Sequence, residues 1–409
     1  MDAKKIHAGT MMRLLILSTK LPYPPRDGGA IATLNLASGL ADAGIDVSML
    51  TFNTVKHHTN PEDLPAGLRS MIRFQAIDKD TSIRPLKALC NLFFSRQPYI
   101  AERYQDRKFR EQLIDLVTST HFDYVQLEGP YLGQYIPDIR KHTSAGISLR
   151  AHNVEHLIWK RRQQNATGPL RKFYFGLLAK RIKRLEMEII RKIDLLIPIS
   201  TPDAEILAKE QQLPSIIIPA GLDLREYTLT SGGKGNEICF IGALDWAPNQ
   251  EGLAWFIDLV LPRVLEKKPG AQLHVAGRNA PHGIISLLSH PAVIYHGEVE
   301  DAQAYMLNFG ILAVPLLTGS GIRIKILEGM AMGMCIVTTH TGAAGLPAQH
   351  GKHLFTEDDP EQFADRLLEH LDDPSRRNAI GKAARKMIHE KFDTFTIASG
   401  LAAFYKKMA

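Results

Sequence analysis

Cysteine is scarce in this sequence, which has three in 409 residues: Cys90, Cys239 and Cys335. Their odd number and wide spacing argue against a disulfide framework and a zinc site, and they favour a reducing compartment. No run of about 18 apolar residues occurs, so the sequence predicts no membrane-spanning helix. The apolar segment 12–17 is short and is followed by prolines, so we expect a buried first strand there and not a signal peptide. A cytoplasmic location is the expectation.

A large excess of charge of one sign is also missing. The net charge is +6, which suits an anionic ligand or an anionic membrane surface but gives little support to nucleic-acid binding. Hydrophobic residues make up 45% and charged residues 22%, the composition of a globular protein. Because 409 residues exceed one ordinary core, we expect two domains.

Short apolar runs alternate with longer amphipathic stretches, a pattern typical of parallel sheets wrapped by helices. The sequence therefore predicts an α/β fold of two Rossmann-like, doubly wound domains. Helices are expected at 29–43, 249–268, 301–308, 322–333, 360–372 and 376–408. Strands are expected at 13–18, 46–52, 70–76, 123–127, 147–151 and 194–199 in the first half, and at 237–241, 271–276, 292–296, 310–315 and 334–338 in the second.

The expected domain boundary lies in a stretch that changes from apolar to glycine-rich. We expect a first domain over 1–215, a linker over 216–236 and a second domain over 237–392. A C-terminal helix over about 393–409 carries Phe395 and Phe404 and is expected to pack back on the first domain.

The segment 317–333 follows a predicted strand and opens a predicted helix. Gly319 and Gly321 free backbone N–H groups to face a ligand, and the start of a helix carries partial positive charge. Arg323 and Lys325 lie in the first turn, where cations oppose the helix dipole at a cost of up to about 1 kcal/mol. A diphosphate would offset that cost, and Glu328 then suits the ribose hydroxyls. The alternative is a surface helix with solvated charges.

The sequence from Ser320 to Val337, SGIRIKILEGMAMGMCIV, resembles the donor-site motif of glycosyltransferase family 4, a retaining family with the GT-B fold. The resemblance covers roughly residues 12–400 and its motifs follow the family's order. The further matching segments are 27–29 (DGG), 150–153 (RAHN), 192–200 (KIDLLIPIS), 219–223 (PAGLD), 241–244 (IGAL) and 275–278 (VAGR).

Three positions depart from the family pattern. Ser320 replaces the first of two glutamates, Glu328 being the second, and Ala220 replaces an asparagine. The segment 245–249 lacks the usual diphosphate-binding arginine and lysine, so Arg323 and Lys325 are the expected substitutes.

The resemblance implies two domains facing across a cleft and a retaining transfer of sugar from a nucleoside-diphosphate sugar to an acceptor hydroxyl, with no metal. The acceptor would be a saccharide or a lipid-linked molecule, in cell-surface polysaccharide or glycolipid synthesis. His152 would contact the sugar, Glu128 would bind the acceptor hydroxyl, and Arg323 and Lys325 would stabilise the leaving diphosphate. The residues expected to bind the nucleotide sugar are Gly28, Gly29, Gly242, Asn249, Gly277, Val299, Gly319, Ser320, Gly321, Ile322, Arg323, Lys325 and Glu328.

Structural roles remain the alternative for His152 and Glu128. Asp78 and Asp80 have a metal-binding spacing but lie outside the doubly wound pattern, and His152 and His156 lack a third zinc ligand. The basic stretch 171–192 is either a solvated face or, with 83–104, a surface for peripheral contact with an anionic membrane.

Three other functions fit parts of the sequence. A nicotinamide oxidoreductase needs a Gly-x-Gly-x-x-Gly segment after the first strand and an acid ending the second strand, and both are missing. A non-hydrolysing sugar-nucleotide epimerase shares the fold and the donor. A catalytically silent nucleotide-sugar-binding protein would explain Ser320. The donor base, the sugar and the acceptor stay open.

Overall fold

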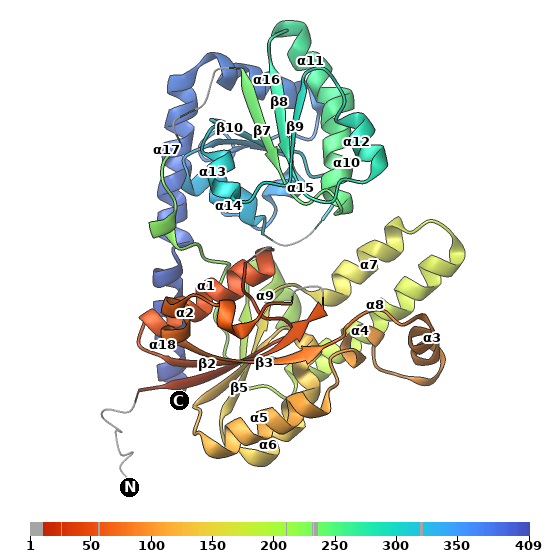
Figure 1. Cartoon of the computed structure of the whole chain (residues 1–409), viewed down its shortest axis with the longest axis vertical. Helices are drawn as coiled ribbons and strands as arrows, with labels where there is room; N and C mark the ends of the chain where they lie inside the picture. Colours follow the sequence, from red (N-terminus) through yellow and green to blue (C-terminus); the bar gives the residue numbers. More distant parts are fainter. Residues whose placement is uncertain are drawn as a thin grey trace. The chain divides into compact units, whose positions relative to one another are not determined.

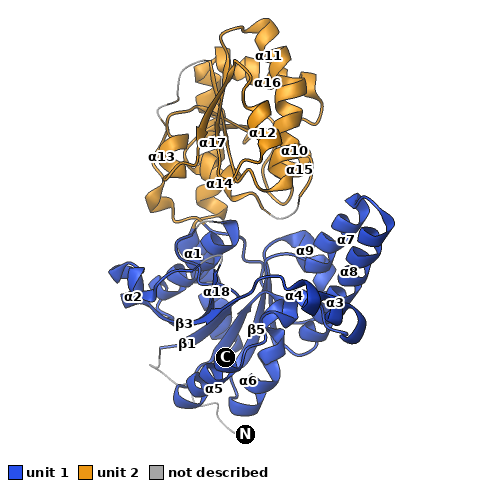
Figure 2. Cartoon of the chain, turned by 45° about the vertical axis from the view of Figure 1, so that its right-hand side comes forward, with its two compact units in different colours: residues 1–221, 394–409 blue, residues 222–393 orange. Residues whose placement is uncertain are grey.

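The computed structural model describes residues 11–25, 27–55, 58–209, 211–230, 232, 236–319 and 322–409. The chain forms two compact units (Figure 2). Unit 1 comprises Met1–Gly221 and Thr394–Ala409, and unit 2 comprises Leu222–Asp393. The chain therefore passes from unit 1 to unit 2 and returns for its last helix.

Unit 1 contains a parallel six-stranded sheet of order β3-β2-β1-β4-β5-β6. Its interior strands are buried almost throughout, because helices cover both faces of a doubly wound sheet. The strands are β1 (Arg13–Ser18), β2 (Asp46–Thr54), β3 (Ile72–Lys79), β4 (Tyr124–Glu128), β5 (Gly146–Ala151) and β6 (Leu195–Pro198).

The helices of unit 1 surround this sheet (Figure 1). The side chain of Asp27 accepts a hydrogen bond from the backbone N–H of Ala30, which caps the first of them. The helices are α1 (Gly28–Asp42), α2 (Ala66–Met71), α3 (Pro85–Phe94), α4 (Tyr99–Glu102), α5 (Arg107–Ser119), α6 (Ile136–His142), α7 (Glu155–Asn165), α8 (Pro169–Ile190), α9 (Thr201–Leu207) and α18 (Thr394–Met408).

The C-terminal helix α18 is part of the core of unit 1. Leu401 and Tyr405 are fully buried in the cluster that contains Leu14 and Ile16 of β1. The Tyr405 hydroxyl lies 2.7 Å from the Ser148 hydroxyl and donates to Gln126 Oε1 at 2.7 Å. Burial of these side chains accounts for the return of the chain end to unit 1.

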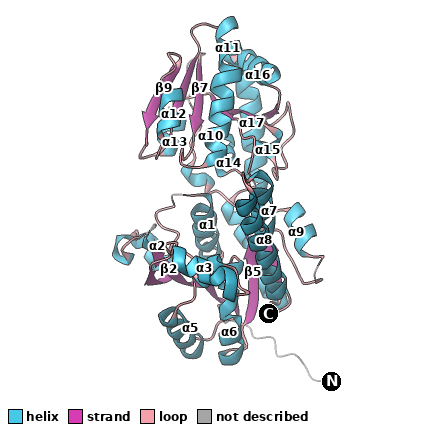
Figure 3. Cartoon of the chain, turned by 90° about the vertical axis from the view of Figure 1, so that its right-hand side faces the viewer, coloured by secondary structure: helices cyan, strands magenta, loops and turns pink. Residues whose placement is uncertain are grey.

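Unit 2 repeats the architecture with a sheet of order β12-β11-β10-β7-β8-β9. Figure 3 shows strands lying between helices in both units. The strands of unit 2 are β7 (Glu237–Ile241), β8 (Gln272–Ala276), β9 (Val293–Gly297), β10 (Ile311–Val314), β11 (Cys335–Thr338) and β12 (Phe355–Thr356). Its helices are α10 (Ala247–Trp255), α11 (Leu261–Lys267), α12 (His282–Leu287), α13 (Ala302–Met306), α14 (Ile324–Ala331), α15 (His340–Ala343), α16 (Pro360–Asp372) and α17 (Pro374–Lys391).

The two parallel sheets confirm the predicted fold class, and each predicted strand is present. The predicted helix over 249–268 contains a π-helical turn at Phe256–Val260. Pro262 follows this turn and cannot donate a backbone hydrogen bond, which disrupts the regular helical ladder. The predicted helix over 376–408 is two helices, α17 in unit 2 and α18 in unit 1.

The expected linker over 216–236 is shared between the two cores. Ile216 and Ile218 pack in unit 1, whereas Leu222, Leu224 and Tyr227 are buried in unit 2. The structure therefore changes units between Gly221 and Leu222. Most of the glycine-rich end of this stretch, Ser231 and residues 233–235, lies outside the described residues. Within the described ranges, no helix is long and apolar enough to cross a bilayer.

The packing of α1 against α18 predicts that Gly39→Val destabilises the protein. A Cβ at Gly39 would lie 2.8 Å from Ala398 Cβ and 2.8 Å from Thr394 Cγ2, inside van der Waals contact. We expect a loss of about 1–3 kcal/mol in the free energy of unfolding, measured by urea denaturation. Gly400→Ala is the matched control, because an added Cβ there meets no atom within 4 Å. It should be neutral or stabilising, and equal losses in both variants would contradict the packing argument.

Candidate functional site

Two glycines follow neighbouring strands at the carboxyl edge of the sheet in unit 2. Gly242 follows β7 and Gly277 follows β8. A Cβ on Gly277 would lie 2.1 Å from the Gly242 carbonyl oxygen, and one on Gly242 would lie 2.6 Å from Asn249 Nδ2. Side chains are thus excluded at both positions, which leaves bare backbone at the edge where open α/β sheets bind ligands.

The segment between β10 and α14 reaches the same edge. Gly319 has a φ of +126°, a conformation that residues with side chains rarely adopt. Helix α14 begins at Ile324, two residues later than expected, and Arg323 occupies its N-cap position. Ser320 and Gly321 lie outside the described residues, so their expected roles stay predictions.

Lys325 on α14 reaches across to the end of β7. Its Nζ donates to the carbonyl oxygen of Ile241 at 2.9 Å and to Oδ1 of Asn249 at 3.0 Å. It also lies 4.8 Å from the centroid of the Phe240 ring. Asn249 Nδ2 in turn donates to the Ala243 carbonyl at 2.8 Å. Lys325 is therefore held in place by neutral acceptors.

The charge of Lys325 is poorly compensated by its surroundings. Burial first, and then the nearby charge of Arg323, lower the pKa of Lys325 to about 7. Among the residues that the structure describes, no carboxylate forms an ion pair with it. Even a partly buried cation is costly without a counter-charge, so a bound anion would stabilise this site.

Glu328 lies one turn further along α14. The hydroxyl of Tyr227 donates to Glu328 Oε1 at 3.1 Å. Burial raises the pKa of Glu328, and the hydrogen bond from Tyr227 opposes the increase. Val299 and Ile322, also expected at the nucleotide, are partly buried and pack on the core cluster that contains Ile326 and Leu327.

Sequence reasoning missed Trp246. Its side chain is 40% exposed, and the Arg323 guanidinium carbon lies 5.9 Å from its ring centroid. An exposed indole beside an arginine at the carboxyl edge of a sheet offers a flat surface for stacking. The signal in the sequence was an aromatic residue soon after the end of β7. The sequence analysis considered this segment, 245–249, only for the arginine and lysine that it lacks.

In unit 1, Glu128 is the centre of a buried polar cluster at the end of β4. Its Oε2 lies 2.6 Å from His152 Nε2 and 3.2 Å from Arg150 Nη1, and it accepts from the Thr33 hydroxyl at 2.9 Å. Gln126 Nε2 donates to the other carboxylate oxygen. The structure thus brings together Glu128 and His152, two of the predicted catalytic residues.

Burial would raise the pKa of Glu128, but the charges of Arg150 and His152 and the hydrogen bonds outweigh it and hold the pKa at about 2. Glu128 is therefore a carboxylate at neutral pH. Arg150 is fully buried, whereas the side chain of His152 is 22% exposed. His152 is the member of the cluster that a ligand can reach.

Gly28 and Gly29 form the first turn of α1. A Cβ on Gly29 would meet only Asp27 Oδ1 at 3.4 Å and Lys20 Nζ at 3.8 Å, so packing does not exclude a side chain there. The exposed start of this long helix leaves backbone N–H groups available to a ligand.

The two metal alternatives receive no support from the geometry. Asp78 Oδ1 accepts from Asn53, and Asp80 accepts from Ser82 and Arg84. His156 Nδ1 lies 2.7 Å from Glu186 Oε2, so it and His152 have different partners. In the described part of the chain, no group of three or more His, Cys, Asp or Glu side chains could hold a metal ion.

Comparison with known proteins gives a match in the second unit and two relatives. Residues 235–373 match the family described as "Glycosyl transferases group 1". A Klebsiella pneumoniae protein described as an uncharacterized 44.6 kDa protein in the cps region is 25% identical over 416 residues, 96% of this chain and 99% of that protein. A Corynebacterium glutamicum GDP-mannose-dependent monoacylated α-(1-6)-phosphatidylinositol monomannoside mannosyltransferase is 25% identical over 197 residues, 43% of this chain and 51% of that one.

Solved structures match nearly the whole chain. Sucrose-phosphate synthase from Thermosynechococcus elongatus superposes with a TM-score of 0.72 at 15% identity, covering 97% of this chain and 99% of that one. Anabaena HepE in complex with UDP and glucose gives a TM-score of 0.66 at 13% identity, covering 97% and 100%. At these identities the likeness establishes the fold, which is that of GT-B glycosyltransferases. The matched domain, the Corynebacterium relative and the fold together support a glycosyltransferase.

Proposed function

We propose that this protein moves a sugar, with retention of anomeric configuration, from a nucleoside-diphosphate sugar to an acceptor hydroxyl. The observation that carries the proposal is Lys325, a partly buried cation at the carboxyl edge of the unit 2 sheet without a carboxylate partner among the described residues. The leaving group of such a reaction is a diphosphate, which supplies the missing negative charge. The Corynebacterium relative is named for its dependence on GDP-mannose, and the HepE structure is solved with UDP. Both support a donor of this class.

In this mechanism the barrier falls because negative charge that grows on the leaving diphosphate meets cations already in position. Arg323 and Lys325 provide that charge, and the bare backbone at Gly242 and Gly277 allows the nucleotide to approach closely. We assign Glu328 to the ribose hydroxyls, with Asn249 positioning Lys325. Because two side-chain cations face the diphosphate, we propose that the reaction needs no metal.

In unit 1 we assign His152 to contact with the transferred sugar. An ionised Glu128 can only accept hydrogen bonds, so His152 Nε2 carries the hydrogen and Nδ1 is left for the ligand. The sequence analysis assigned Glu128 to the acceptor hydroxyl. Its contacts with Thr33, Gln126, Arg150 and His152 favour a different role, and we propose that it is a positioning residue for His152.

We place the activity in the synthesis of cell-surface polysaccharide or glycolipid, on the cytoplasmic side of the membrane. The Klebsiella relative from the cps region and the phosphatidylinositol mannoside acceptor of the Corynebacterium relative support this setting. The acceptor would then be a saccharide or a lipid-linked molecule.

Helix α3 has the properties of a surface for peripheral contact with an anionic membrane. Leu86, Phe93 and Phe94 are 79%, 71% and 88% exposed. The segment 82–97 that contains them carries three cations and no acidic residue. Arg181 of α8 donates to the Asn91 and Leu92 carbonyls, which fixes α3 beside another basic helix (Figure 2). Apolar side chains surrounded by cations match a bilayer that contains acidic lipids.

The proposed diphosphate site of unit 2, with Arg323 and Lys325, predicts that Lys325→Gln prevents donor use. We expect turnover to fall by about 100-fold or more, and the thermal shift given by the preferred nucleoside diphosphate to disappear. Lys382→Gln, which changes an exposed lysine of the same unit, is the control and should behave as the parent protein. A donor sugar that is converted without any acceptor would instead indicate an epimerase.

Diphosphate binding should also take up a proton. With a pKa of about 7, Lys325 is mostly neutral in the free protein at pH 8, and the negative charge of a bound diphosphate would raise that pKa and recharge it. Calorimetric titrations at pH 8 in buffers of different ionisation enthalpy should show uptake that approaches one proton. Lys325→Gln should abolish this uptake, and its persistence in that variant would remove Lys325 from the diphosphate site.

Glu128→Gln is expected to cost about 3–5 kcal/mol of stability, because it leaves the buried Arg150 charge without a partner. The pKa of Glu128 is lowered from 4.5 to about 2, so its stabilising contribution is complete above pH 4.5 and is lost as the pH falls towards 2. Urea denaturation should therefore give a difference between variant and parent that shrinks in acid. Glu111→Gln removes an exposed pair with Arg107 and should cost less than about 1 kcal/mol.

The membrane surface predicts that Phe93→Ser with Phe94→Ser weakens co-sedimentation with vesicles of phosphatidylglycerol and phosphatidylcholine. Each buried phenylalanine contributes about 1.5–3 kcal/mol, so we expect a loss of more than tenfold in the partition coefficient. Vesicles of phosphatidylcholine alone should bind the parent weakly. Phe395→Ser is the control, since Phe395 is an exposed phenylalanine on α18 of the same unit. Equal losses in the control and in the α3 variant would contradict the assignment.

A further inference from the structure

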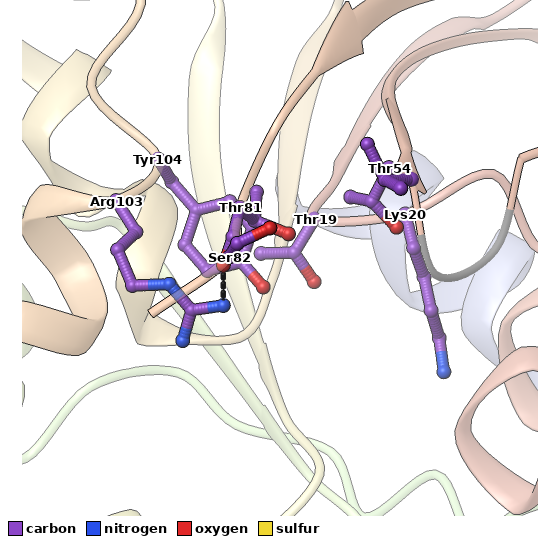
Figure 4. Close-up of a pocket in the computed structure, with 8 residues that line it drawn as sticks. Thr19, Lys20, Thr54, Thr81, Ser82, Arg103 and Tyr104 are labelled. Atoms are coloured by element: carbon purple, nitrogen blue, oxygen red, sulfur yellow. Dashed lines mark hydrogen bonds between the residues drawn. The ribbon is translucent and has the colours of Figure 1, made fainter. Parts of the chain in front are cut away.

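Unit 1 contains a cavity of about 510 Å³ to which none of the roles above has been assigned (Figure 4). It lies where β1, β2 and β3 end, at the carboxyl edge of the sheet, and the chain that enters α3 and leaves α4 completes it. Arg103 and Tyr104 lie on one side of it and Lys20 on the other, with Thr19 between them. The lining residues are Thr19, Lys20, Thr54, Val55, Thr81, Ser82, Arg103 and Tyr104.

The cavity lining contains hydroxyl groups and cations but no anions. Five of the lining side chains carry hydroxyl groups and two carry positive charge, but none is a carboxylate. Carboxylates are the strongest acceptors for the hydroxyl groups of a neutral sugar, and this cavity offers none. Hydroxyl and guanidinium donors are instead suited to an oxyanion.

The two cations differ in how they are compensated. Lys20 Nζ lies 2.6 Å from Asp27 Oδ1, and this ion pair neutralises most of its charge. Arg103 donates to the Thr81 carbonyl, and its buried Nε has no hydrogen-bond partner. No carboxylate in the described ranges forms an ion pair with it. Arg103 therefore brings to the cavity wall a positive charge that no carboxylate of the described residues balances.

We propose that this cavity binds an anionic group of the acceptor, the phosphate of a sugar phosphate or the carboxylate of a uronic acid, with Arg103 as the anchoring residue. The proposal rests on the transferase function and adds the class of acceptor. The planar fork of arginine forms paired hydrogen bonds with both kinds of oxyanion. The volume falls within the range of about 300–1,000 Å³ that small-molecule sites occupy, and it leaves room for a sugar ring beside the charged group.

Methyl NMR on protein labelled at threonine methyl groups tests this directly, because Thr19, Thr54 and Thr81 line the cavity. We expect glucose 6-phosphate or glucuronic acid to shift these three resonances, and glucose to leave them unchanged. Titrating each anion separately identifies which one the cavity prefers. Arg103→Gln should weaken that binding at least tenfold, and Arg103→Lys, which keeps the charge without the fork, should weaken it less. Arg107→Gln, an exposed arginine on α5, should have no effect.

The same spectra separate this proposal from the transferase function. Thr318 lies just before Gly319 in unit 2, so its methyl group reports nucleoside-diphosphate binding. Suppose that Thr318 responds to a nucleotide, while the cavity threonines respond equally to glucose or do not respond to the anions. That result overturns the proposed class of acceptor but leaves the transferase function standing. Unchanged anion affinity in both Arg103 variants overturns it too. If the cavity threonines respond as expected but Thr318 responds to no nucleoside diphosphate, the anion site is supported. The proposal that a nucleoside-diphosphate sugar is the donor is then contradicted.

Discussion

The contact on which the site in unit 2 depends is the pair of hydrogen bonds from Lys325 Nζ to the Ile241 carbonyl and to Asn249. These bonds tie the first turn of α14 to the end of β7 and fix a cation where the sheet meets solvent. The arrangement is expensive without a ligand, because burial and Arg323 disfavour the charged form and lower the pKa of Lys325 to about 7. Neutral acceptors hold the ammonium in place but do not balance its charge. The site in unit 2 is thus preorganised for an anion.

Unit 1 solves the opposite electrostatic problem with a carboxylate. Arg150 is fully buried, and Glu128 neutralises it while also holding His152. The cluster therefore has a charge balance of its own, and its one accessible member is an imidazole with a fixed hydrogen. A site of this kind is suited to orienting a neutral hydroxyl group, whereas the cations of unit 2 are suited to attracting a negatively charged group such as a diphosphate. In the proposed transfer reaction, the different charges of the two sites suit them to different tasks.

Much of the fold could be predicted from the sequence, because parallel sheets buried on both faces leave continuous apolar runs such as LLIL in β1 and LLIP in β6. The errors have local physical causes. Pro262 interrupts the helical ladder in a stretch with a regular apolar period, and β12 has only two residues. The change of units after Gly221 depends on where Ile218 and Leu222 are buried, which composition does not reveal. The change of units lies within the expected linker over 216–236, whose glycine-rich end was the visible signal.

The candidate site was predictable where glycine and charge mark it in the sequence, as at Gly319 and Lys325, and less so where pairing between distant residues decides a role. Glu128 and Thr33 are 95 positions apart, and only folding brings the hydroxyl of one to the carboxylate of the other. Arg103 and Thr81 are likewise joined across two helices. In both cases the residue type is common in proteins. Its role depends on whether a partner of opposite charge neutralises its side chain. Balanced charges such as Glu128 keep the scaffold in shape, and the unbalanced ones, Lys325 and Arg103, identify where anions are to be sought.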